Sequence, residues 1–236
     1  MTDVSNAQQL ITELRNSRQA LSIDNEVVEF VEYFGAEAGE LCLELVHQTK
    51  PELILELGLA HGTSSLYLLQ GIVDNGFGRL LSMDPYQFES FKGVGLKNIQ
   101  RAGLDCFHQF ICQRSDIALP LMINEYGGQL RSDFIFIDTS HQFDQTIVEA
   151  YFCDKILKPG GLIVFDDYGL ASVKSACNFI ESNLHYVPFG RQCNNVRVLR
   201  KTAEDDRRWY DFVPFSVDTT DQMNWRRERD DDNKNG

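Results

Sequence analysis

Residues 53–64 of the chain are Leu-Ile-Leu-Glu-Leu-Gly-Leu-Ala-His-Gly-Thr-Ser, and this stretch decides the fold class. The apolar run from Leu53 to Leu57 predicts a buried strand, and the segment from Thr63 to Ile72 has the apolar spacing of a helix. Between them, Gly58 and Gly62 predict a turn whose backbone can approach a bound nucleoside closely. The helix N-terminus offers free amide groups to an anionic group.

The spacing of the acid and the glycines separates two kinds of nucleotide site. Glu56, Gly58 and Gly62 form the pattern E-x-G-x-x-x-G. A dinucleotide-binding turn, G-x-G-x-x-G, needs its third glycine where this chain has Thr63 or Ser64, so a pyrophosphate has no obvious cradle here. A turn of this kind also occurs as a bare connection between a strand and a helix, so the remainder of the chain has to decide.

Length and composition restrict the class of protein. The chain has 236 residues, of which 43% are hydrophobic, enough for one sizeable core with appendages. Its net charge of -13 disfavours a nucleic-acid partner, because neutralising phosphates needs clustered Lys and Arg, and favours a small-molecule substrate. There is no C-x-x-C pair, no signal-peptide pattern and no apolar run near the ~20 residues of a membrane span. We therefore expect a reduced, cytoplasmic protein that binds neither nucleic acid nor membrane.

Apolar runs alternate with helical patterns over residues 51–200, which predicts a single domain with a doubly wound α/β sheet. Strands are predicted near 52–57, 79–83, 108–112, 133–137, 161–165, 185–189 and 195–199, and helices near 63–73, 89–102, 117–126, 143–156 and 171–183. Two further helices, near 5–20 and 25–48, are expected to precede the sheet, and residues 1–50 are expected to cap the substrate site.

The last two predicted strands follow one another with no helix between them, so they should form a terminal antiparallel hairpin with Pro188 at an edge. A seven-stranded Rossmann-like sheet with such a hairpin and the E-x-G-x-x-x-G turn resembles the class I S-adenosylmethionine-dependent methyltransferases. The resemblance implies that the glycine turn holds the methionine moiety of S-adenosylmethionine.

Ligands of an open parallel sheet bind at the carboxyl ends of its strands, and the residues that follow the predicted strands are mostly acidic. Asp84 lies about 20 residues beyond the glycine turn, where a carboxylate can accept hydrogen bonds from both ribose hydroxyls. A turn before Pro85 or a helix cap is the alternative. The resemblance places Ser115 and Asp116 beside the adenine, although Asp116 would also cap the next helix. The predicted cofactor contacts are Glu56, Gly58, Gly62, Ser64, Asp84, Ser115, Asp116 and Asp138. His61, inside the turn, is expected to face the cofactor without a chemical role.

Three carboxylates follow two neighbouring strands. Asp138 ends one of them, and Asp166 and Asp167 follow the next. Like charges so close need a cation between them or raised pKa values, and a hard ion such as Mg2+ or Mn2+ takes oxygen ligands. This segment resembles the metal-dependent O-methyltransferases, which implies that these three acids hold the metal and that His141 is the general base. Thr139 departs from the residue commonest there. The structural alternatives are that Asp138 only lines the cofactor pocket, that Asp166 or Asp167 caps a helix, and that His141 is a surface residue.

The sequence thus predicts methyl transfer from S-adenosylmethionine to a hydroxyl of a small molecule, assisted by Mg2+ or Mn2+. Two alternatives stay open: a metal-independent methyltransferase acting on nitrogen, carbon or a protein side chain, and a non-catalytic cofactor-binding or scaffold protein. A homodimer is an open possibility, and the methyl acceptor cannot be deduced.

The acidic tail, residues 201–236, is rich in charge runs, and its last dozen residues are expected to be disordered. Its aromatic stretch, from Trp209 to Phe215, is expected to pack on the domain or to cover the substrate cleft.

Overall fold

A seven-stranded sheet forms the centre of the molecule. The computed structural model describes residues 6–191, 193 and 195–219. The sheet order is β5-β4-β3-β6-β7-β9-β8, and β9 pairs antiparallel with both β7 and β8. Its strands are β3 (Leu53–Leu57), β4 (Arg79–Met83), β5 (His108–Ile111), β6 (Ser132–Ile137), β7 (Leu157–Phe165), β8 (Tyr186–Pro188) and β9 (Arg197–Lys201). The predicted doubly wound sheet with a terminal hairpin is therefore confirmed, with Pro188 on the edge strand.

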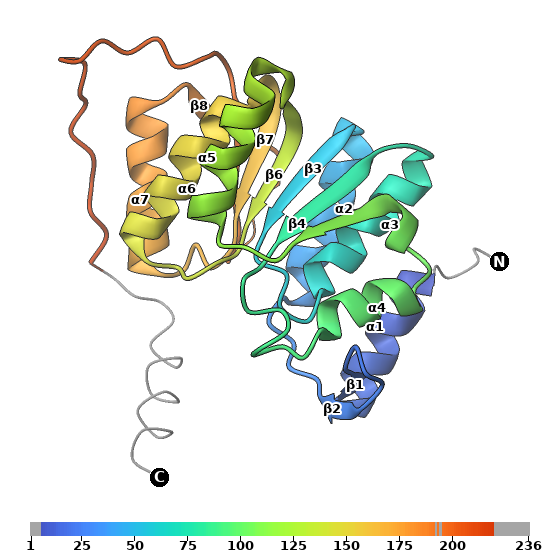
Figure 1. The fold of residues 1–236 in the computed structure, drawn as a ribbon. Helices are drawn as coiled ribbons and strands as arrows, with labels where there is room; N and C mark the ends of the chain where they lie inside the picture. Colours follow the sequence, from blue (N-terminus) through green and yellow to red (C-terminus); the bar gives the residue numbers. More distant parts are fainter. Residues whose placement is uncertain (1–5, 192, 194, 220–236) are drawn as a thin grey trace.

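Helices cover both faces of this sheet (Figure 1). One face carries α1 (Asn6–Ser17), α2 (Ala36–Thr49), α3 (Thr63–Asn75) and α4 (Val94–Arg101), and the other carries α5 (Ser115–Tyr126), α6 (Phe143–Ile156) and α7 (Ala171–Asn183). Two short 3-10 turns, η1 (Asp105–Phe107) and η2 (Gly127–Gln129), precede β5 and β6. Each of these helices buries apolar residues, and α1 packs on α3 and α4, outside the layer that covers the sheet.

The N-terminal region differs from the sequence prediction. The helix predicted for 25–48 begins only at Ala36, because residues 19–29 form a small antiparallel hairpin of β1 (Gln19–Leu21) and β2 (Val27–Glu29). Two β-branched residues, Val27 and Val28, pair with Leu21 and Ala20, and Asn25 makes the turn with a positive φ of 67°. Short valine-rich segments favour strands once a partner strand lies beside them. The prediction that the second helix begins near residue 25 was therefore wrong.

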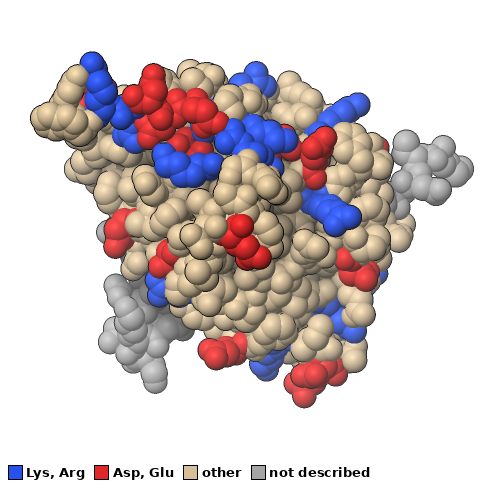
Figure 2. All heavy atoms as spheres, turned by 45° about the horizontal axis from the view of Figure 1, so that its top comes forward, with Lys and Arg blue, Asp and Glu red and all other residues tan. Residues whose placement is uncertain are grey.

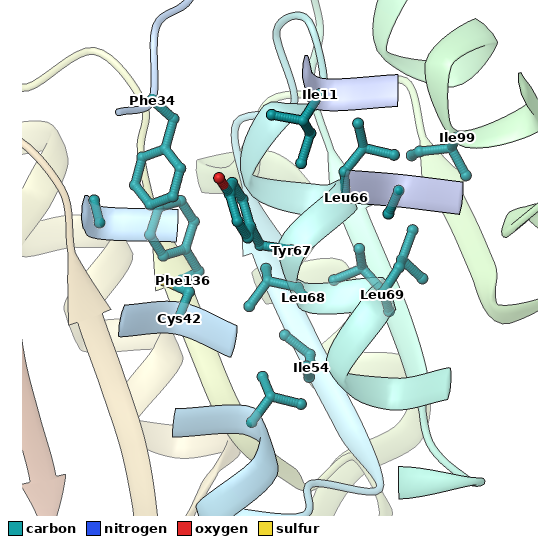
Figure 3. Close-up of a cluster of buried hydrophobic side chains, with 14 of the residues drawn as sticks. Ile11, Phe34, Cys42, Ile54, Leu66, Tyr67, Leu68, Leu69, Ile99 and Phe136 are labelled. Carbon is teal, nitrogen blue, oxygen red and sulfur yellow. The ribbon is translucent and has the colours of Figure 1, made fainter. Parts of the chain in front are cut away.

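The N-terminal elements share the core of the sheet rather than forming a separate unit. Phe34, from the connection between β2 and α2, packs edge to face on Phe136 of β6, with ring centroids 5.3 Å apart. Figure 3 shows these rings beside Tyr67 and Leu68 of α3 and Ile54 of β3. A second cluster, which includes Leu119, Ile135 and Ile163, lies on the other face of the sheet under α5, α6 and α7.

The described part of the tail runs along the outside of α7 (Figure 1). Val213 exchanges two hydrogen bonds of 2.8 Å with the Asn183 side chain, and the Phe215 ring packs on Phe179. Trp209, however, is 95% exposed, so the expectation that it packs on the domain is wrong. Residues 220–236, which were expected to be disordered, lie outside the described residues.

Surface charges of both signs are interspersed on the face shown in Figure 2, where basic and acidic side chains lie next to one another. Ion pairs among the described residues include Lys158 with Asp133 at 2.7 Å and Arg207 with Asp205 at 2.8 Å. No helix in the described part of the chain is long and apolar enough to cross a membrane.

Candidate active site

A pocket of about 490 Å³ opens at the carboxyl ends of the parallel strands, where the sequence predicts a ligand site. This volume lies in the usual range for small-molecule sites. Its lining includes a residue that follows each of β3, β4, β5, β6 and β7, namely Gly58, Asp84, Ser115, Asp138 and Asp167. The remaining lining residues are Tyr33, Ala60, Met83, Pro85, Tyr86, Phe91, Arg114, Asp116, Thr139, Ser140, His141, Gln142, Gln145 and Glu149.

Gly58 and Gly62 shape the turn between β3 and α3 in different ways. Gly58 has a φ of +95°, and a Cβ atom there would lie 1.8 Å from the carbonyl oxygen of Asp138. Only glycine lets the tips of β3 and β6 approach so closely. Gly62, with a φ of +77°, precedes the first turn of α3, and its Cβ would lie 3.0 Å from the Cα of Gly95. Gly58 lines the pocket, whereas Gly62 packs behind it.

Glu56 and Ser64 lie beneath the turn and not at the pocket wall. The Glu56 carboxyl is completely buried and accepts hydrogen bonds from the hydroxyls of Ser64 at 2.7 Å and Ser65 at 2.5 Å. Burial raises the pKa of Glu56 to about 8, although the two serine hydrogen bonds oppose the rise. Neither Glu56 nor Ser64 is among the pocket-lining residues. They fix the start of α3 and thereby the shape of the glycine turn.

Asp84 lines the pocket and also holds the glycine turn. One carboxylate oxygen, Oδ2, accepts hydrogen bonds from the backbone amides of Leu59 at 3.1 Å and Ala60 at 2.9 Å. The other, Oδ1, accepts from the amide of Tyr86 at 2.8 Å, which is the turn geometry that the sequence offered as the alternative. Each carboxylate oxygen has two lone pairs, so the turn contacts leave capacity for a ligand hydroxyl.

His61 does not line the pocket, contrary to the expectation that it faces the cofactor. Its Nδ1 accepts a hydrogen bond of 3.2 Å from the amide of Val31, and its ring packs among Phe30, Tyr33 and Phe91. Burial lowers the pKa of His61, which favours the neutral ring. The histidine therefore ties the segment after β2 to the glycine turn, while Tyr33 and Phe91 face the pocket.

Ser115 and Asp116, the predicted adenine contacts, both line the pocket at the start of α5. Arg114 donates two hydrogen bonds, at 2.9 and 2.8 Å, to the Asp116 carboxylate, and these lower the pKa of Asp116. Ser115 donates its hydroxyl hydrogen to Glu149 of α6. Asp116 therefore pairs with a neighbouring arginine instead of capping the helix.

Asp138, His141 and Asp167 form a compact group at the ends of β6 and β7. The Nε2 atom of His141 lies 3.0 Å from Oδ1 of Asp138 and 3.2 Å from Oδ2 of Asp167. One potential ligand atom from each of the three residues lies within 4.8 Å of the others. Both His141 and Asp167 have positive φ angles, of 57° and 54°. Such strained conformations are typical of functional sites, where the surrounding structure holds a side chain in place.

Asp166 is not part of this group. The Asp166 amide donates to the Ile137 carbonyl oxygen as the strand would, and the Asp166 carboxylate contributes no atom to the group of three. The Nδ2 atom of Asn195 lies 2.9 Å from Oδ1 of Asp167 and 3.4 Å from Oδ1 of Asp166. The structure thus brings two of the three predicted metal ligands together, with His141 in the third place.

Glu149 is the main site residue that the sequence analysis missed. It is fully buried on α6, lines the pocket and accepts hydrogen bonds from Ser115, Thr139 and Gln145. A signal was present, because Glu149 has the helical spacing of the buried residues Thr146 and Cys153. An acid on the buried stripe of a helix needs partners, and such residues mark functional sites.

Comparison with known proteins identifies the class of domain. Residues 55–168 match a family described as a methyltransferase domain. A segment of 116 residues is 34% identical to a catechol O-methyltransferase from Niastella koreensis and covers 48% of this chain and 48% of that protein. The chain therefore matches about half of the length of this relative.

Solved structures share the fold over nearly the whole chain. A crystal structure of a putative O-methyltransferase from Klebsiella pneumoniae has a TM-score of 0.64 at 16% identity, over 86% of this chain and 92% of that one. An O-methyltransferase from Bacillus cereus, in complex with SAH, has the same TM-score and identity over 85% and 93%. The predicted class I methyltransferase domain is confirmed: residues 55–168 form it, within a sheet of the fold that these O-methyltransferases have.

Proposed function

We propose that this protein transfers a methyl group from S-adenosylmethionine to a hydroxyl oxygen of a small molecule. The observation that carries the proposal is the meeting of Asp138, His141 and Asp167 in the pocket that the glycine turn of a methyltransferase domain borders. The curated relative with 34% identity is named as a catechol O-methyltransferase, which supports oxygen as the acceptor atom. The Bacillus cereus neighbour is in complex with SAH, which supports the cofactor.

The proposed cofactor contacts fall into two groups. Gly58, Asp84, Ser115, Asp116 and Asp138 line the pocket and are the proposed direct contacts. Glu56, Gly62 and Ser64, behind the wall, are proposed to act through the shape of the turn. The sulfonium of the cofactor supplies an activated methyl group, so these residues have chiefly to align it with the acceptor and to exclude water.

A divalent cation fits the residues at the ends of β6 and β7. Asp138 and Asp167 offer two carboxylates close together, of which Asp167 is almost fully buried, and such a pair needs a positive charge beside it. We propose Asp138 and Asp167 as ligands of Mg2+ or Mn2+, with Asp166, which shares the Asn195 amide with Asp167, as a further ligand. A bound divalent ion would supply charge neutralisation and would acidify a hydroxyl group of the acceptor.

His141 is proposed as the general base. Its ring lines the pocket, and the carboxylates of Asp138 and Asp167 beside Nε2 stabilise the imidazolium that forms when the ring takes up the acceptor's hydroxyl proton. The backbone of His141 is held by a hydrogen bond of 2.6 Å from the Ser172 hydroxyl to its carbonyl oxygen. The base is thereby anchored to α7.

One observation favours the metal-independent alternative. Because Nε2 of His141 lies within hydrogen-bond distance of both Asp138 and Asp167, a protonated imidazole can balance their charge without an ion. The acceptor atom in that case is nitrogen, carbon or a protein side chain. The two candidates differ in whether a chelator affects the reaction.

The segment 30–35, between β2 and α2, is proposed as the cap of the acceptor site. Tyr33 from this segment and Phe91 from the loop after β4 face the pocket, with ring centroids 6.0 Å apart at 80°. Tyr33 is 47% exposed, so it is free to pack on a bound molecule. Phe34, the next residue, anchors the segment in the core.

Calorimetry and a chelator series test the proposal. S-adenosylmethionine or its demethylated product should bind with micromolar to sub-millimolar affinity, and Asp84→Ala should weaken binding by at least about 1 to 3 kcal/mol, since it also releases the turn. With a panel of catechols and other hydroxyl compounds, methyl transfer should stop in excess chelator and return with Mg2+. If neither compound binds, or if NAD binds equally well, S-adenosylmethionine is not the cofactor. Full activity in excess chelator contradicts the proposed Mg2+ or Mn2+ site and favours the metal-independent methyltransferase.

A further inference from the structure

The buried carboxylate of Glu149 accepts hydrogen bonds from three side chains. Thr139 Oγ1 donates to Oε2 at 2.8 Å, and the Ser115 hydroxyl and Gln145 Nε2 both donate to Oε1, the latter at 3.1 Å. Glu149 itself is fully buried, yet it belongs to the pocket lining together with all three partners. Burial raises the pKa of Glu149, and the three hydrogen bonds oppose that rise.

This arrangement fixes the direction of two hydrogen bonds at the pocket wall. An ionised carboxylate only accepts, and a hydroxyl group has a single hydrogen to donate. Because Ser115 and Thr139 both give their hydrogen to Glu149, each can only accept from a ligand. A ligand atom that faces these hydroxyls must therefore carry a hydrogen. An acceptor atom in the same place would meet unpaired lone pairs, which is costly in a buried site.

The order of the strands indicates which part of the cofactor faces this wall. The sheet order β5-β4-β3-β6-β7 places Asp84, after β4, between Ser115, after β5, and the group of Asp138, His141 and Asp167. With the ribose at Asp84 and the methyl group directed toward His141, the base extends toward β5. Ser115 begins α5 on that side, and Thr139, although it follows β6, donates to the same Glu149 carboxylate as Ser115. The purine edge is therefore the part of the ligand nearest to both hydroxyls.

We propose that Glu149 makes the pocket selective for a 6-aminopurine over a 6-oxopurine, by holding Ser115 and Thr139 as acceptors. Glu149 is thus a positioning residue that acts through two hydroxyl groups. The proposal rests on the proposed function, because it takes the nucleoside of S-adenosylmethionine as the ligand. The exocyclic amino group of adenine donates two hydrogens, whereas the oxo group in the same position only accepts.

Calorimetric titration of the full chain with two ligands tests this. S-adenosylhomocysteine carries the 6-amino group, and S-inosylhomocysteine differs by a 6-oxo group and a protonated N1. The wild-type protein should prefer the amino form by about tenfold or more. Glu149→Gln keeps the shape but presents an amide that donates, so at least one hydroxyl turns its hydrogen to the pocket. The preference should then fall below about threefold. Glu125→Gln, on the exposed side of α5, is the matched control and should keep the wild-type ratio.

A second variant covers the case in which Glu149→Gln does not fold. Ser115→Ala removes one accepting hydroxyl and leaves the Glu149 carboxylate with two donors, so it should weaken the amino ligand more than the oxo ligand. Equal affinity of the wild-type protein for both ligands overturns the inference alone, as does a preference that Ser115→Ala and Glu149→Gln leave unchanged. If the wild-type protein binds neither ligand, the proposed function is wrong and the inference falls with it.

Discussion

Replacement of Glu56 by glutamine should make folding less sensitive to alkaline pH. Glu56 is fully buried, and burial raises its pKa from the ordinary value of 4.5 to about 8. At a pH between these two pKa values, the folded chain holds a proton on Glu56 that the unfolded chain has lost. Stability therefore falls as pH rises through this window, because the folded state binds more protons than the unfolded state.

The magnitude follows from the two pKa values. Their difference, 8 minus 4.5, sets an upper limit of roughly 5 kcal/mol on the pH-dependent part of the unfolding free energy. Between about pH 5.5 and pH 8.5 that contribution changes by roughly 3 kcal/mol. Glutamine has the shape of the protonated acid, so it can accept from one of Ser64 and Ser65 and donate to the other. It does not titrate, so this loss of stability should disappear.

Urea unfolding of the wild-type and variant proteins at both pH values measures this effect. The difference between the two proteins removes the contributions of other groups, such as Glu149, whose pKa burial also raises. Glu56→Gln should gain roughly 3 kcal/mol relative to the wild type on going from the lower to the higher pH. Glu125→Gln, an exposed replacement, should show no such change. A difference between wild type and Glu56→Gln that stays constant with pH refutes the reasoning.

Three further predictions concern the turn, the base and the tail. Gly58→Ala should destabilise the fold by more than about 2 kcal/mol in urea and abolish S-adenosylhomocysteine binding, because its Cβ would lie 1.8 Å from the Asp138 carbonyl oxygen. His141→Ala should lower kcat on the order of 10² to 10⁴ while calorimetry gives unchanged cofactor affinity; an unchanged kcat excludes it as the base. Lys201→Met should cost roughly 3 to 5 kcal/mol, because the buried ammonium contacts Asp154 and the Leu157 carbonyl oxygen in the domain and Glu204 in the tail. Limited proteolysis should then cut residues 202–219 faster than in the wild type, and equal rates would show that the Lys201 contacts do not hold the tail.

The sheet could be predicted from sequence because its signals are local. Apolar runs bounded by glycine and charged residues placed all seven strands of the main sheet, and β3 and β4 agree within one residue of the prediction. The strand ends then placed Asp84, Asp138 and Asp167 at one edge of the sheet, since parallel strands end together. The rule that parallel strands end at one edge was therefore enough to predict that acids far apart in the sequence share one pocket, without knowledge of any side-chain contact.

The features that the sequence analysis missed depend on contacts between distant residues. The hairpin of β1 and β2 has three residues a strand, too few for a periodicity, and only the pairing reveals it. His61 lies outside the pocket lining and accepts a hydrogen bond from the amide of Val31, thirty positions earlier. Asp166 and Asp167 are neighbours in sequence and both lie beside Asn195, yet only Asp167 contributes an oxygen atom to the group with Asp138 and His141. Glu149 depends on donors from three elements, none of which a motif connects.

The glycine motif itself separates residues that touch a ligand from residues that hold the turn. Of its members, Gly58 lines the pocket, while Glu56, Gly62 and Ser64 lie behind the wall. A change at a supporting residue alters the folded shape, so stability and cofactor affinity should fall together. A change at a contact residue such as Asp138 should alter affinity or rate with little loss of stability. Plotting affinity against unfolding free energy for such variants therefore distinguishes the two groups, and a supporting residue that lowers affinity alone must be reassigned as a contact.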